Sequence, residues 1–147
     1  MNPDLLFTII NFLALLIWLM LFFAPFSRLY NIFIRSGLIF IVFGIAYAII
    51  MISFFNVDPR NLNSLEGVKS LLNNDWAFVA GWIHYLAFDL LAGIWILNDS
   101  VKAGIKRGWI IVPLIFTFMA GPLGLLLYFI IKAIQRKSLY MNVTEWA

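Results

Sequence analysis

The chain has 147 residues, of which 64% are hydrophobic and 12% charged, and its formal net charge is +3. Soluble globular domains have about 45–50% apolar and about 25% charged residues, so this composition excludes that class and indicates a membrane protein. The absence of cysteine excludes a disulfide scaffold, a thiolate metal cluster and a cysteine nucleophile. The ten basic residues are scattered between apolar runs, which is typical of membrane-flanking anchors and not of a nucleic-acid surface.

Four apolar runs are long enough to cross a bilayer. A hydrocarbon core about 30 Å thick needs roughly 20 residues of helix. The runs that meet this length are residues 5–24, 37–55, 76–97 and 109–131. They are too long and uniform for barrel strands, so each is predicted to be a helix. The first run is expected to be a retained helix, not a signal peptide, because no basic residue precedes it.

Short connections join these runs in pairs. One extends from Pro25 to Arg35 and the other from Asn98 to Gly108. The expected fold is therefore an all-α membrane protein in which four transmembrane helices form two antiparallel hairpins, as a single integral membrane domain covering residues 1–147. No sequence repeat relates the two halves, which argues against a duplicated transporter.

The connection of residues 56–75 is the longest polar segment, and apolar residues recur in it at helical spacing. They are Leu62, Leu65, Val68, Leu71 and Leu72. This pattern predicts a short amphipathic helix between spans 2 and 3 that starts near Asn63 or Ser64 and lies in the headgroup layer. The alternative is a solvated loop in which the spacing is accidental.

Lysine and arginine counts do not separate the two sides of the membrane. One side has Arg60, Lys69, Lys132, Arg136 and Lys137, and the other has Arg28, Arg35, Lys102, Lys106 and Arg107. The second set lies in shorter loops with fewer acidic residues, which favours a cytoplasmic location for those loops. The tail residues Lys132, Arg136 and Lys137 are expected to anchor the fourth helix at the interface.

Only the third run contains ionisable residues, His84 and Asp89. On a regular helix they are about 140° and about 7.5 Å apart, so they face different neighbours. Asp89 lies near the middle of the run, where a carboxylate must be protonated or hydrogen-bonded. It either transfers protons or ties helices together through Asn11 or Tyr47. His84 is either a structural residue or an acid–base group.

Other features of the third and fourth runs leave similar alternatives open. Asp99 follows the third run and is either a solvated charge or a substrate contact. It lies about 15 Å from Asp89 along a helix, so these residues with His84 do not form a metal site. In the fourth run, Pro113 and the segment 121–124 predict a kink, which either opens a cleft or serves ordinary packing. No hydrolase, nucleotide-binding or zinc-protease motif occurs.

Three segments resemble the abscisic-acid-deficient-four family, whose plant members are related to neoxanthin synthase. The segments are Gly81-Trp82-Ile83-His84-Tyr85-Leu86-Ala87-Phe88-Asp89-Leu90, Gly121-Pro122-Leu123-Gly124-Leu125-Leu126-Leu127-Tyr128 and Ser64-Leu65-Glu66-Gly67-Val68. The resemblance covers most of the chain and is weakest in the first helix. It implies a four-helix membrane protein of carotenoid metabolism, and in plants the conversion of violaxanthin to neoxanthin.

That conversion opens an epoxide and forms an allene, so it needs one group to protonate the epoxide oxygen and another to remove a proton. The resemblance makes His84 and Asp89 the expected catalytic residues. No cofactor and no metal are expected. The expected substrate-binding residues are Trp82, Tyr85, Phe88, Gly93, Trp95, Asp99, Gly121 and Pro122. The expected partners are membrane lipid, a carotenoid or other isoprenoid, and a second copy or a carotenoid enzyme.

Two other function classes stay open. The chain could be a non-catalytic membrane partner or a pigment- or lipid-binding protein. A proton-coupled transporter draws support from Asp89 alone. The chain is short and has no Arg- and Ser-rich leader, so a bacterial inner (cytoplasmic) membrane is the expected location and not a plastid.

Overall fold

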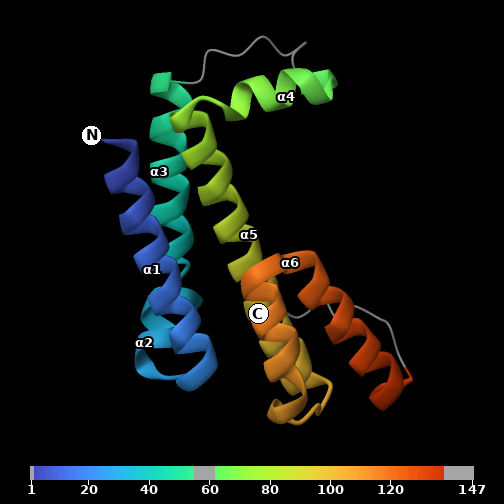
Figure 1. Cartoon of the computed structure of the whole chain (residues 1–147). Helices are drawn as coiled ribbons and strands as arrows, with labels where there is room; N and C mark the ends of the chain where they lie inside the picture. Colours follow the sequence, from blue (N-terminus) through green and yellow to red (C-terminus); the bar gives the residue numbers. More distant parts are fainter. Residues whose placement is uncertain (1, 55–61, 138–147) are drawn as a thin grey trace. The chain divides into compact units, whose positions relative to one another are not determined.

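The computed structural model describes residues 2–54 and 62–137, in which all regular secondary structure is helical (Figure 1). The long helices are α1 (Pro3–Phe23), α3 (Leu38–Phe54), α5 (Asp75–Lys102) and α6 (Arg107–Arg136). The short helices are α2 (Arg28–Tyr30), the π-helix η1 (Asn31–Arg35) and α4 (Leu65–Leu72). By length and composition alone, four helical segments are candidate membrane spans, and α4 lies between the second and third of them. The predicted all-α membrane fold with its additional short helix is confirmed.

The chain forms two compact units. Unit 1 consists of Met1–Ile17 and Phe26–Ala87, and unit 2 of Trp18–Pro25 and Phe88–Ala147. Helices α1 and α5 each begin in unit 1 and end in unit 2. The expectation of a single membrane domain stays a prediction.

In unit 1, α1 runs alongside α5 in the same direction. The rings of Phe7 and Phe78 have centroids 6.5 Å apart, and one turn further along the Trp82 Nε1 donates a hydrogen bond to Asn11 Oδ1 at 3.0 Å. In both pairs the two residues are the same number of positions apart in sequence. This is expected of two parallel helices, because both rise by the same distance per residue. Asn11, which the sequence suggested as a partner for Asp89, therefore accepts a hydrogen bond from Trp82.

Both faces of α1 are apolar. Its buried side chains recur every three or four residues, as one helical face does; they are Leu6, Ile10, Ala14 and Ile17. The exposed side chains include Leu5, Ile9, Phe12, Leu16 and Leu19. A helix that is hydrophobic all round is typical of a membrane span, so the exposed face is suited to contact with lipid chains.

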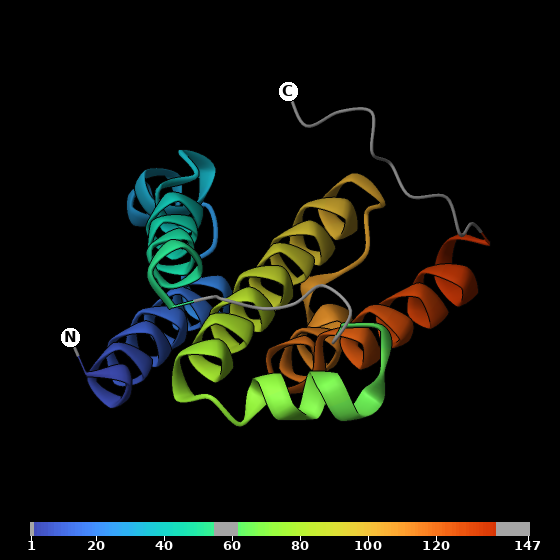
Figure 2. The same ribbon diagram turned by 90° about the horizontal axis from the view of Figure 1, so that it is seen from above.

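The short helix α4 begins where the sequence predicts. Ser64 is its N-cap, and the Ser64 Oγ accepts a hydrogen bond from the Gly67 N–H at 3.1 Å. Asn74 caps the next helix in the same way, since its Oδ1 accepts from the N–H groups of Trp76 and Ala77. Helix α4 lies crosswise to the start of α5 (Figures 1 and 2). Its location in the headgroup layer stays a prediction.

The connection between α1 and α3 differs from the short turn that the sequence suggested. It is helical, because Ser27 caps α2 through a hydrogen bond from the Tyr30 N–H at 3.2 Å, and η1 follows directly. Gly37, with φ of 77°, ends this helical segment. A positive φ costs less free energy for glycine than for any other residue, because glycine has no Cβ atom.

In unit 2, helix α6 is interrupted at Ala120, whose φ of −159° and ψ of 77° are not helical. The second arm, residues 121–136, follows α5 in parallel: Trp95 contacts Tyr128, Asp99 contacts Lys132, and the Gly104 carbonyl accepts from Arg136. Each pair is 32 or 33 residues apart in sequence. The first arm starts just after α5 ends, so α6 must reverse direction at Ala120 (Figure 1). The kink predicted in the fourth run is therefore present, and it is sharp enough to fold α6 back on itself.

Gly124 lets the two arms of α6 meet. A Cβ atom at Gly124 would collide with Thr117 and with the carbonyl oxygen of Pro113, both in the first arm. Thr117 is fully buried, and its Oγ1 donates to that same carbonyl at 2.8 Å. The segment 121–124 therefore forms the elbow of the fold-back.

A second glycine, Gly93 on α5, closes the contact with α1 in unit 2. A Cβ at Gly93 would lie 2.5 Å from Trp18 Cη2, inside the indole ring's van der Waals surface. Because Trp18 is only 1% exposed, its ring has little room to move. We expect Gly93→Ala to lower the free energy of unfolding in detergent by about 1–3 kcal/mol. Gly44→Ala, where no atom lies within 4 Å, is the matched control; an equal loss in both variants would contradict this contact.

Candidate functional site

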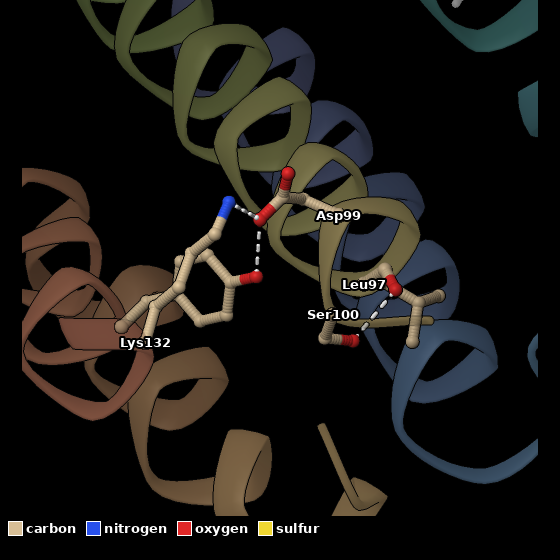
Figure 3. Close-up of polar contacts among 5 residues, drawn as sticks. Leu97, Asp99, Ser100 and Lys132 are labelled. Carbon is tan, nitrogen blue, oxygen red and sulfur yellow. Dashed lines mark hydrogen bonds and ion pairs between the residues drawn. The ribbon is translucent and has the colours of Figure 1, made fainter. Parts of the chain in front are cut away.

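A buried polar cluster in unit 2 surrounds Asp99, in the last turn of α5. Lys132 Nζ lies 2.6 Å from Asp99 Oδ2, and the Tyr128 hydroxyl donates a hydrogen bond to the same oxygen. The Lys132 and Asp99 side chains are 3% and 1% exposed. Figure 3 shows the Lys132 ammonium group directed at the Asp99 carboxylate. The ammonium group of Lys132 and the hydroxyl of Tyr128 thus both contact one buried carboxylate oxygen of Asp99.

The interpretation of Asp99 as a solvated charge is wrong, and so is that of Lys132 as an interfacial anchor. Both side chains are buried and paired with one another. The physical reason is the fold-back of α6, which returns its second arm alongside α5 and brings Lys132 to the level of Asp99. Burial of either charge alone would be costly, so the pairing is what makes this location tolerable.

Two polar atoms of the cluster stay unpaired among the residues that the structure describes. Asp99 Oδ1 is a buried acceptor and Trp95 Nε1 a buried donor, and neither has a hydrogen-bond partner. The Trp95 ring stands edge-on to Tyr128, with centroids 5.5 Å apart and planes at 88°. Buried polar groups in native proteins are nearly always satisfied. One unpaired donor and one unpaired acceptor beside the same tyrosine are what a polar ligand group would satisfy.

Asp89 occupies a second polar position, at the middle of α5. It is 6% exposed, and a Cβ on Gly121 would collide with its carboxylate, 2.8 Å from Cγ. Gly121 begins the second arm of α6, whose N-terminal end carries a partial positive charge. The broken helix therefore gives the carboxylate a favourable electrostatic environment.

The remaining predicted residues divide between the two units. Trp82, His84 and Tyr85 belong to unit 1, where the exposed His84 ring lies 6.3 Å from that of Tyr47. Trp82 stacks on Tyr85 with centroids 5.5 Å apart. In unit 2, Phe88 and Pro122 are exposed, whereas Gly93, Trp95 and Gly121 are buried. The structure joins Asp89 with Gly121, and gives His84 and Asp89 different neighbours.

Sequence reasoning missed Tyr128 and Lys132 as members of the site. Tyr128 stands in one of the family-like segments but was assigned no role. The signal for Lys132 was available, since apolar residues continue after it, at Ala133 and Ile134. A lysine enclosed by apolar residues needs a partner, whereas an interfacial anchor ends an apolar run.

A cleft of about 670 Å³ opens between the two arms of α6, near the same end. Its lining is mostly apolar and comes from Lys106, Gly108, Trp109, Val112 and Ile131. Ile131 directly precedes Lys132. An apolar chain could occupy this cleft with a polar end near Lys106.

Comparison with known proteins identifies one family. A family model described as ABA DEFICIENT 4-like matches residues 5–128, which include Asp89, Asp99, Gly121 and Tyr128 but not Lys132. No curated protein and no solved structure matches the chain. The family is linked to neoxanthin synthesis. The chain is a multi-span helical membrane protein that belongs to the ABA DEFICIENT 4-like family.

Proposed function

We propose that this protein binds a carotenoid or a related isoprenoid in the membrane and modifies its polar end-group, as a neoxanthin synthase would. Family membership supports the substrate class. The observation that carries the proposal is the buried cluster at Asp99, with an unpaired acceptor on Asp99 and an unpaired donor on Trp95. A hydroxyl or epoxide oxygen of an end-group would satisfy these atoms.

The depths of Asp89 and Asp99 in the membrane favour Asp99 as the residue that contacts the carotenoid end-group. The two residues are about 15 Å apart along α5, with Asp89 at its middle and Asp99 near its end. Oxygen atoms cost free energy in hydrocarbon, so the end-groups of an oxygenated carotenoid lie near the headgroups while its chain spans the core. The apolar cleft between the arms of α6 lies at the same end as Asp99 and offers room for such a chain.

The cluster contains the groups that the chemistry requires. In an epoxide-to-allene isomerisation, a proton goes to the epoxide oxygen as the carbon–oxygen bond breaks, and a carbon next to the ring loses a proton to form the new double bond. No oxidant or reductant is needed, because product and substrate are isomers. Lys132 and Tyr128 can donate a proton and Asp99 can accept one. His84 and Asp89 stay proposed acid–base groups on the family resemblance, and within unit 2 Asp89 is the one proposed to lie beside the polyene.

Pigment binding without conversion is the second candidate, and one observation favours it. The shared oxygen of Asp99 is already held by Lys132 and Tyr128, as expected of a tie between α5 and α6. In that case the protein presents pigment to a carotenoid enzyme or to a second copy of itself. Proton-coupled transport is the third candidate, supported by Asp89 alone. For any of these, we propose the cytoplasmic membrane of a bacterium as the location.

Conversion is tested by expressing the chain in a bacterial host supplied with violaxanthin and separating the extracted pigments. We expect a new product of unchanged mass with wild-type protein. General acid–base groups contribute about 10²–10⁴-fold to rate, so Asp99→Asn, which can still accept from Tyr128, should lower conversion by that factor. The exposed substitution Lys69→Gln is the control. Unchanged pigments with folded wild-type protein would refute conversion, and full conversion by Asp99→Asn would remove Asp99 from it.

A further inference from the structure

We propose that α6 is a re-entrant hairpin that enters and leaves the membrane on one side, and that the exposed basic residues collected there face the anionic headgroups of the cytoplasmic leaflet. This proposal does not depend on the proposed function. The surface is the basic one at the two ends of α6, and the lipid partner is an anionic phospholipid.

Contacts at both ends of α6 show that the ends lie close together. Near its start, Arg107 donates to the carbonyl oxygen of Phe22, in the last turn of α1. At its end, Arg136 donates to the carbonyl oxygen of Gly104, three residues before Arg107. A straight 30-residue helix would be about 45 Å long, far beyond the reach of an arginine side chain. The second arm therefore returns to the side from which the first arm departs.

Neither arm is long enough to cross alone. The interruption at Ala120 leaves arms of 13 and 16 residues, about 20 Å and 24 Å of helix, against a hydrocarbon core of about 30 Å. The elbow contacts Asp89, at the middle of α5, so it lies at half depth. Interrupted backbone is tolerated there only when protein buries it, and both Gly121 and Gly124 are buried.

The fold-back changes the charge balance between the two sides. With α1, α3 and α5 each crossing once, chain order puts the end of α5 on the same side of the membrane as the α1–α3 connection. The returning arm of α6 adds its three basic residues to that side. Eight of the ten basic residues then belong to one side: Arg28, Arg35, Lys102, Lys106, Arg107, Lys132, Arg136 and Lys137. Among the described basic residues, only Lys69 stays on the other side. The even division expected from four complete crossings becomes a strong asymmetry.

The partner of this surface follows from its charge. Basic residues next to membrane helices are retained on the cytoplasmic side, where anionic lipids attract them. Four of the eight have exposed side chains that form no hydrogen bond or ion pair within the described part of the chain; they are Arg28, Arg35, Lys106 and Lys137. These side chains are available to phospholipid phosphates. The C-terminal end of α6 is thus cytoplasmic and the N-terminal end of α1 is not.

The absence of native cysteine makes the test direct. Four single substitutions at exposed positions, Asn2→Cys, Asn31→Cys, Ser70→Cys and Lys137→Cys, are expressed in the full chain and treated with a membrane-impermeant maleimide. We expect Asn2→Cys and Ser70→Cys to react in intact cells with the outer membrane permeabilised, and the other two only after the inner membrane is opened. Equal labelling of all four in detergent controls for reactivity.

Two results would overturn the proposal. Labelling of Lys137→Cys together with Asn2→Cys in intact cells would mean that α6 crosses the membrane completely. Labelling of Asn31→Cys and Lys137→Cys from outside, with Asn2→Cys protected, would place the basic surface away from the cytoplasmic leaflet.

Discussion

Replacing Lys132 by leucine is expected to be among the most destabilising single changes in this protein. It would leave the Asp99 carboxylate buried without its cation, since Lys132 Nζ lies 2.6 Å from Asp99 Oδ2 and both side chains are at most 3% exposed. Breaking a buried ion pair by removing one partner costs about 3–5 kcal/mol. We expect a loss of that size in the free energy of unfolding, measured by reversible denaturation in mixed micelles.

Adding Asp99→Asn to Lys132→Leu should recover most of that loss. The asparagine carries no charge, and its carbonyl can still accept from the Tyr128 hydroxyl. The control is Lys69→Leu on α4, an exposed site expected to change stability by less than about 0.5 kcal/mol. If Lys132→Leu costs no more than this control, the buried pair is absent in the micelle-bound protein. If the double variant is less stable than Lys132→Leu, the unpaired carboxylate is not the source of the loss.

The second large effect is expected at the elbow of α6. A Cβ at Gly121 would collide with the Asp89 carboxylate, which is buried and has only a short side chain with which to move away. We expect Gly121→Ala to lower the free energy of unfolding by about 1–3 kcal/mol, as overpacking does. Helix propensity alone would predict the opposite sign, because alanine is favoured over glycine in helices.

A double-mutant cycle with Asp89→Ala isolates this contact. Once the carboxylate is removed, Gly121→Ala should cost little, giving a coupling energy of about 0.5–3 kcal/mol between the two sites. Gly44→Ala, in open surroundings on α3, should be neutral or stabilising. Additive effects of the two substitutions at positions 89 and 121 would show that they do not touch.

The long helices could be predicted from the sequence because hydrophobic length and uniformity define them locally. Ser64 could be identified as a cap of α4 for the same reason, since capping needs only a hydroxyl side chain and its neighbours in sequence. The fold-back at Ala120 could not be predicted in full. Pro113 and the segment 121–124 indicate an interruption, but direction after an interruption depends on contacts such as Asp99 with Lys132.

The candidate site depends on the same non-local contacts. Asp99 was interpreted as solvated because it follows the third apolar run, at the start of a connection rich in charged residues. Its partner in the structure, Lys132, is 33 residues away. Asp89 and Gly121 could each be singled out, as an acid inside a span and a glycine beside proline. Their contact could not be predicted. It is evident only from the structure, in which a Cβ atom at Gly121 would collide with the Asp89 carboxylate.

The absorption spectrum of the wild-type protein, purified in mild detergent from a host that makes oxygenated carotenoids, tests the central claim most directly. We expect carotenoid bands to co-purify with the protein and to yield a defined pigment on extraction, equally with the Lys69→Gln control. Asp99→Asn should shift the composition of the bound pigment towards the unmodified end-group. Folded, colourless protein from a fully pigmented host would contradict the claim that this membrane protein acts on a carotenoid.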